Sequence, residues 1–291
     1  MNMRYCYLAK RVILALVMLA APMVQAATTP PAVAPNPLYP PGIGWNPVVD
    51  YTLPNFAQSP NIRKFVDKMP GVGASGCTVS SPAGTGTCNE NNLGQYIPLA
   101  LPDQTSYLGS DYYEIGLKQY QKQLHSDLPP TLLRGYYQKN GTDSSLNYLG
   151  PLILAKRNTA VRFKFYNELG PSGTTGVNGG DLFLPVDTTI MGAGEGPVVG
   201  KFYTQNRSDI HLHGGLTPWI SDGTPHQWIT PAGDPAVAGA PDYQKGASFQ
   251  NVPDMVTGSV VNGTAVPCIG GAKCFTPSAT DGIGTYYYSN Q

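Results

Sequence analysis

Alternation of apolar and polar residues marks the organised part of this chain, which starts near residue 110. In the clearest run, 159–167, Val161, Phe163 and Phe165 alternate with Arg162 and Lys164. Every second side chain of a strand lies on the same face, so this run predicts a half-buried β-strand. Tyrosine-rich and β-branched runs with partial alternation predict further strands. These lie at 111–124, 132–138, 151–154, 182–184, 208–212 and 285–289.

Turn residues separate these runs and dominate the region from 217 to 282. The 291 residues include 34 glycines and 28 prolines, and only 12% of the residues are charged. One short helix is predicted at 61–69, and the chain has no alternating strand–helix pattern that would indicate a parallel α/β sheet. Short strands at roughly ten-residue spacing therefore predict an all-β fold, a Greek-key β-sandwich or barrel with long loops.

Charge excludes two classes of partner. The formal net charge is zero, and Lys and Arg form no cluster. Proteins that bind nucleic acid or an anionic membrane surface carry a basic patch, so neither is expected as a partner.

The first 26 residues predict a signal peptide. Basic residues precede the apolar run 12–21, and Val24-Gln25-Ala26 resembles a cleavage site. The apolar run is shorter than the ~20 residues of a spanning helix, although an uncleaved anchor is the alternative interpretation. We therefore expect an exported protein, periplasmic or extracellular, without a membrane segment after cleavage. The proline- and glycine-rich stretch 27–109 is predicted to be an arm and loop, and 110–291 the folded domain.

Four cysteines follow the predicted signal peptide. They allow three disulfide pairings in an oxidising compartment, and local pairing, Cys77–Cys88 and Cys268–Cys274, is favoured because each pair lies in one glycine-rich loop. Metal ligation is the alternative, but neither pair has a neighbouring histidine.

Two of the four histidines form the motif His211-Leu212-His213. On a strand, residues two apart point to the same face, so both imidazoles could converge on one metal or on two adjacent metals. Imidazole suits copper, zinc, iron and nickel. A hydrogen-bonded pair of strand histidines without a metal is the alternative interpretation.

The residues around this motif carry a family resemblance. The run from His211-Leu-His-Gly-Gly to Ser221-Asp-Gly223 resembles the first copper motif of bacterial multicopper oxidases, nearest to the spore-coat laccase and bilirubin-oxidase-like group. Four other stretches are similar to the same group, at Tyr112-Tyr-Glu114, Gln123–Thr131, Leu182–Ile190 and Tyr286-Tyr-Tyr-Ser-Asn-Gln291. The resemblance covers about 110–291 and implies the first cupredoxin domain of such an oxidase.

The resemblance implies residue roles and partners. His211 would bind the type 2 copper and His213 a type 3 copper, while Asp222 would help to deliver protons for dioxygen reduction. Asp222 precedes Gly223, so a turn-forming role is the alternative. His125 and His226 are expected to be turn or surface residues. The implied partners are dioxygen and a reducing substrate, either a small molecule or a metal ion.

The chain departs from the family pattern, which has four histidine-rich motifs where this sequence has one. It lacks the His-Cys-His sequence and most of the copper ligands. We therefore expect a partial cupredoxin-like domain, truncated before the second copper motif, from the N-terminal part of a secreted oxidase. The alternative is a non-catalytic, secreted copper-binding or structural cupredoxin module. A zinc hydrolase is disfavoured, because no third ligand or general base accompanies the pair.

Overall fold

A computed structural model describes residues 62–73, 77, 87–190, 192–196, 198–234, 244–278 and 281–291. The chain divides into two compact units, 1–62 and 63–291, and the fold below is that of the second. The predicted signal peptide at 1–26 lies outside the described residues. Within the described ranges, no helix is long and apolar enough to span a membrane.

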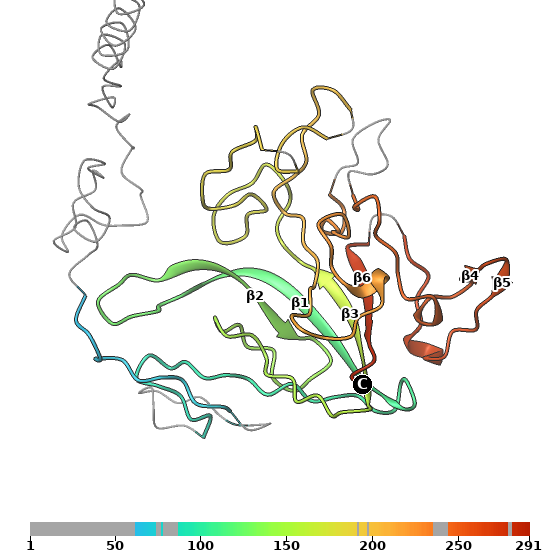
Figure 1. Ribbon diagram of the computed structural model, residues 1–291. Coiled ribbons are helices and arrows are strands. Elements are labelled where there is room, and N and C mark those ends of the chain that lie inside the picture. Colours follow the sequence, from blue (N-terminus) through green and yellow to red (C-terminus); the bar gives the residue numbers. More distant parts are fainter. Residues whose placement is uncertain are drawn as a thin grey trace, which may run out of the picture. The chain divides into compact units, whose positions relative to one another are not determined.

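The unit is organised by one mixed four-stranded sheet in the order β2-β1-β3-β6 (Figure 1). Its strands are β1 (Ser110–Lys122), β2 (Thr131–Gln138), β3 (Ala160–Asn167) and β6 (Ile283–Tyr288). β1 runs antiparallel to β2 and parallel to β3, and β3 runs antiparallel to β6. No helix is described in the connection between the parallel strands β1 and β3. The predicted all-β class is confirmed.

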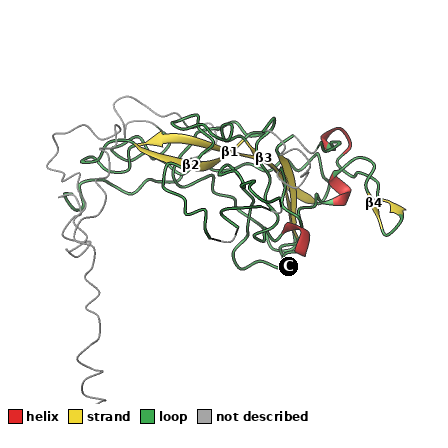
Figure 2. Cartoon of the chain, turned by 90° about the horizontal axis from the view of Figure 1, so that it is seen from above, coloured by secondary structure: helices red, strands yellow, loops and turns green. Residues whose placement is uncertain are grey.

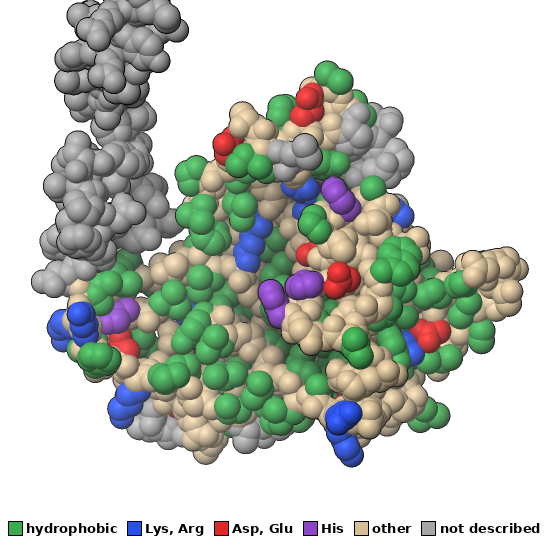
Figure 3. Space-filling model, viewed as in Figure 1, with side chains coloured by type: hydrophobic (Ala, Val, Ile, Leu, Met, Phe, Trp, Pro, Cys, Tyr) green, Lys and Arg blue, Asp and Glu red, His purple; other side chains and the backbone are tan. Residues whose placement is uncertain are grey.

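The remaining elements are short. They are the hairpin β4 (Val260–Val261) and β5 (Thr264–Ala265), and the 3-10 turns η2 (Trp219–Ser221), η4 (Pro253–Met255) and η5 (Gly271–Lys273). Loops make up most of the rest of the described chain (Figure 2). Charged side chains are sparse on the face drawn in Figure 3, in keeping with the composition.

The predicted alternation produces the core. Val161, Phe163 and Phe165 of β3 are buried on one face of the sheet. The Phe163 ring packs against Tyr113 of β1 and Tyr288 of β6, with 5.6 Å between ring centroids in both pairs. Each buried ring of this size contributes about 1.5–3 kcal/mol, so this aromatic face fixes the register of all three strands.

The opposite face of the sheet buries an ion pair. Arg162 is only 5% exposed, and its guanidinium donates to both carboxylate oxygens of Asp254 at 2.6 and 2.9 Å. The rings of Tyr107 and Tyr287 flank the guanidinium at 5.4 and 4.8 Å. The pair ties β3 to η4, which is far away in the sequence.

Three predicted strands and the predicted helix are wrong. The runs 151–154 and 208–212 each contribute one isolated bridge, Leu152 to Leu99 and Ser208 to Ile229, and residues 182–184 form bends. Residues 62–69 form turns without a helix. The short apolar runs find no neighbouring strand to complete a ladder, and proline or glycine interrupts the chain at or close to each of them.

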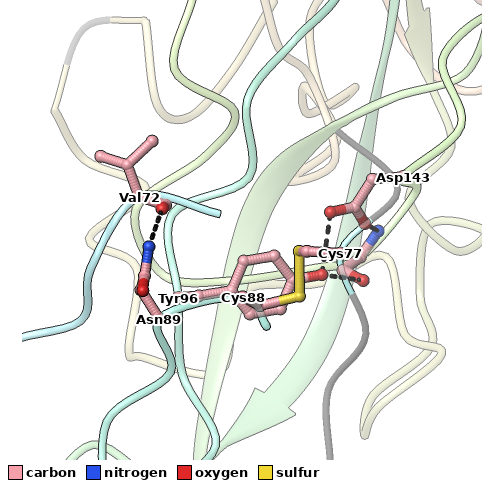
Figure 4. The surroundings of a disulfide bond; sticks show 7 residues. Val72, Cys77, Cys88, Asn89, Tyr96 and Asp143 are labelled. Carbon is pink, nitrogen blue, oxygen red and sulfur yellow. Dashed lines mark hydrogen bonds between the residues drawn. A yellow bond between two sulfur atoms is a disulfide. The ribbon is translucent and has the colours of Figure 1, made fainter. Parts of the chain in front are cut away.

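Both local disulfides are confirmed. Cys77 pairs with Cys88 and Cys268 with Cys274, at Cα separations of 4.9 and 6.2 Å. Tyr96 lies against the first disulfide and donates its hydroxyl hydrogen to Asp143 at 2.8 Å (Figure 4).

Described residues of the predicted arm also join the folded unit. Ala100 belongs to the buried core, and its N–H donates to the Leu152 carbonyl at 2.9 Å. The second compact unit accordingly starts at Arg63, whereas the sequence predicts the folded domain to start at 110.

Substitution of Asp254 by asparagine should lower the free energy of unfolding by about 2–3 kcal/mol, because it leaves the buried Arg162 charge without a counter-charge. Urea unfolding at neutral pH with an unchanged m-value measures this loss. The double variant Arg162→Met, Asp254→Asn should recover part of it, since no buried charge is left unpaired. Equal losses in the single and double variants would contradict this assignment.

Candidate metal site

The two histidines of the motif face each other on a loop rather than on a strand. Their ring centroids are 4.9 Å apart and the ring planes are inclined at 80°. Both side chains are exposed, and histidine side chains lie open on the face drawn in Figure 3. The sequence predicts that the two imidazole rings converge because side chains two residues apart on a strand share a face. In the structure, the conformation of a loop brings the rings together instead.

A buried amide at the end of β3 closes this loop. Asn167 Nδ2 donates to the carbonyls of Asn206 and Ile229 at 2.8 and 2.9 Å. The Ser208 and Ile229 backbones exchange hydrogen bonds at 3.0 and 2.9 Å next to these contacts. The segment between them, 207–228, is therefore anchored to the sheet at both ends.

Gly223 allows the two sides of the loop to approach closely. Its φ of +69° is in the left-handed region, and a Cβ at this position would overlap the carbonyl oxygen of Ile210. This packing places Asp222 opposite His211. The side chain of Gln227, which is 1% exposed, holds the same turn by donating to the Trp219 carbonyl at 2.7 Å.

A hydrogen bond fixes the tautomer of His211. Its Nδ1 lies 2.5 Å from the carbonyl oxygen of Asp222. A carbonyl only accepts, so Nδ1 carries the proton, and the neutral imidazole keeps its lone pair on Nε2. This is how metal-binding histidines are commonly oriented, with one nitrogen donating to a carbonyl and the other facing the metal.

Asp222 has contacts that fit both roles predicted for it, turn formation and proton delivery. It caps η2, and its N–H lies 3.4 Å from the Trp219 carbonyl, as expected of a turn residue. Its carboxylate is 44% exposed, and Oδ1 lies 3.7 Å from His211 Nδ1. A partly exposed carboxylate at this distance can exchange protons with solvent beside the histidine pair.

Asp209 is an acidic neighbour of His211 that the sequence analysis missed. Burial raises the pKa of its carboxyl to about 6, and the charge of His211 opposes this shift. The spacing Asp209-x-His211-x-His213 was the available signal. It carries little information alone, because only the fold shows that the carboxyl is partly buried.

The other two histidines lie at turns, as predicted. His125 Nδ1 accepts from the Asp127 N–H at 3.0 Å, and its Nε2 lies 2.9 Å from the Arg63 carbonyl. His226 is exposed at a turn, and its carbonyl accepts from the Ser248 N–H at 3.1 Å. Among the described residues, no group of three or more His, Cys, Asp or Glu side chains could hold a metal ion.

Comparison with known proteins finds that part of the chain is similar to laccases. No family model matches the chain. It is 40% identical over 122 residues to a laccase of Bacillus subtilis (strain 168), which covers 41% of this chain and 19% of the relative. A laccase of Bacillus stratosphericus is 38% identical over 120 residues, with the same shares. The chain is a relative of laccases.

A third laccase extends the match. The protein of Haloferax volcanii is 32% identical over 184 residues, which covers 61% of this chain and 24% of the relative. The matched part of the chain thus spans about a fifth to a quarter of these laccases. The laccase relationship and the nearly all-β structure together support a cupredoxin-like fold.

Substitution of Gly223 by alanine should lower the free energy of unfolding by at least about 3 kcal/mol, because it adds backbone strain and an overlap with Ile210. The matched control is Gly233→Ala, where φ is +76° but a Cβ would meet nothing within 4 Å. The control should cost about 1 kcal/mol in the same urea titration. Equal costs for both variants would contradict the close packing at Gly223.

Proposed function

We propose that this chain is the N-terminal part of an exported multicopper oxidase and contributes His211 and His213 to its copper site. The single observation that carries the proposal is the hydrogen bond between His211 Nδ1 and the Asp222 carbonyl, which leaves Nε2 free to ligate. The similarity to laccases supports the choice of copper. The predicted signal sequence at 1–26 supports export.

The residues present fit part of a copper site. Two imidazoles with ring centroids 4.9 Å apart, on a loop anchored at both ends, form a donor set that suits copper. In the proposed oxidase, His211 ligates the type 2 copper and His213 a type 3 copper. The other ligands of a three-copper centre come from outside the described residues of this chain.

Bound copper would supply one-electron redox chemistry, which couples oxidation of a phenolic, pigment or metal-ion substrate to reduction of dioxygen to water. The chain's own residues orient the ligands and handle protons. The Asp222 carbonyl holds the His211 ring, while the Asp222 carboxylate takes up protons from solvent and holds them beside the pair. Asn167 and Gln227 keep the loop in place.

A second candidate function is a non-catalytic, secreted copper-binding or structural cupredoxin module. It is favoured by the finding that, among the described residues, no group of three or more His, Cys, Asp or Glu side chains could hold a metal ion. In this case the two histidines would bind one copper ion weakly, and its open coordination positions would be filled by water.

Copper titration of the purified chain tests the histidine pair. Substitution of His211 or His213 by alanine should weaken Cu(II) binding at least about tenfold, because each variant removes one of the two imidazole ligands. The control is His226→Ala, which removes an exposed histidine outside the pair. Isothermal titration, with the nitrogen splitting in the copper electron paramagnetic resonance spectrum, measures both effects.

Copper binding that is equal in the chain and in all three variants would contradict the proposed ligands. Loss of binding in His226→Ala alone would place the copper elsewhere.

A further inference from the structure

A cavity of about 340 Å³ lies beside the histidine loop and has no part in the proposed copper site. It lies between the 182–193 segment and the first residues of the loop, 204–209, and Trp228 also lines it. Small-molecule sites in proteins start at about this volume. Two arginines, Arg134 of β2 and Arg207, contribute to its lining.

Both guanidiniums are held by neutral acceptors. Arg134 donates to the carbonyls of Gln205 and Gly180 at 2.9 and 2.7 Å. Arg207 donates to the carbonyls of Thr204 and Gly192 at 2.8 and 2.9 Å. These bonds leave further N–H donors on each guanidinium.

Neither arginine forms an ion pair with a carboxylate among the described residues. Burial lowers the pKa of both side chains, and the charge of the Asp181 carboxylate opposes this shift at Arg134. A charge that is partly removed from water costs free energy, and a bound anion would lower this cost.

Two buried hydroxyls of lining residues have no hydrogen-bond partner among the described residues. They are Thr204 Oγ1 and Ser208 Oγ, and neither is accessible to solvent in this structure. An unsatisfied buried hydroxyl costs about 1–3 kcal/mol, so native structures seldom retain it without a reason. Thr204 and Ser208 line the same cavity as the two arginines, so the lining carries both hydroxyl and guanidinium donors.

The other walls of the cavity are apolar. Trp228, Val186 and Leu182 line it, and the Trp228 ring lies 4.9 Å from the Arg207 guanidinium. Asp209 also lines the cavity.

We propose that this cavity binds a small organic carboxylate, with the carboxylate between Arg134 and Arg207 and the apolar body against Trp228. Rotation of the Thr204 and Ser208 side chains about χ1 turns their hydroxyls toward the cavity, where they donate to the bound carboxylate. The proposal requires neither copper nor the histidine pair.

Isothermal titration of the metal-free, purified chain with benzoate tests this site. Benzoate should bind saturably, whereas benzamide, which has the same shape without the charge, should bind at least about tenfold more weakly. Inorganic phosphate should also bind more weakly than benzoate, since it has no apolar body.

Variants locate the binding. Thr204→Val with Ser208→Ala removes only unpaired hydroxyls, so the protein should fold at least as stably and bind benzoate about tenfold more weakly. Arg207→Gln should lose binding more completely. The matched control is Arg157→Gln, which removes an exposed arginine outside the cavity and should bind as the unchanged chain does.

The proposal would be overturned if benzoate showed no saturable binding at about 10 mM. Equal binding of benzamide and benzoate would also overturn it. So would benzoate binding that the Thr204 and Ser208 substitutions leave unchanged. Phosphate binding in the absence of benzoate binding would also overturn it, because the site would then recognise inorganic oxoanions.

Discussion

The side-chain amide of Asn167 is the contact on which the candidate site depends. It stands at the end of β3, is 3% exposed, and donates to the carbonyls of Asn206 and Ile229. One buried side chain thus holds both ends of the loop that carries the histidine pair. The aromatic face of the sheet holds β3 rigidly, so the loop takes its position from the core rather than from its own short-range contacts.

Within the closed loop, backbone geometry sets the chemistry of the site. Gly223 lets the turn pack against Ile210, and this packing brings the Asp222 carbonyl to His211 Nδ1. The resulting tautomer presents Nε2 outward for a metal. The same loop starts with Arg207 and Ser208, which line the neighbouring cavity, so one anchored segment carries both the proposed copper ligands and the proposed anion site.

The sequence predicts the parts of this structure that follow from local pattern. Alternation locates β3, tyrosine-rich runs locate β1 and β6, and cysteine spacing predicts both disulfides. The apolar runs at 151–154, 182–184 and 208–212 have the same local pattern but no partner strand, and pairing is a property of the whole fold. For the same reason, the partial burial of the Asp209 carboxyl and the placement of Arg134 and Arg207 in the lining of one cavity could not be read from spacing.

The central claim is that the fold holds His211 in the tautomer that a metal ligand requires, before any metal binds. The most direct test is the ¹⁵N chemical shifts of its imidazole ring in the metal-free chain, at a pH where the ring is neutral. The account predicts a protonated Nδ1 and an unprotonated Nε2 for His211. A ring protonated on Nε2, or one that exchanges freely between the two tautomers, would contradict it.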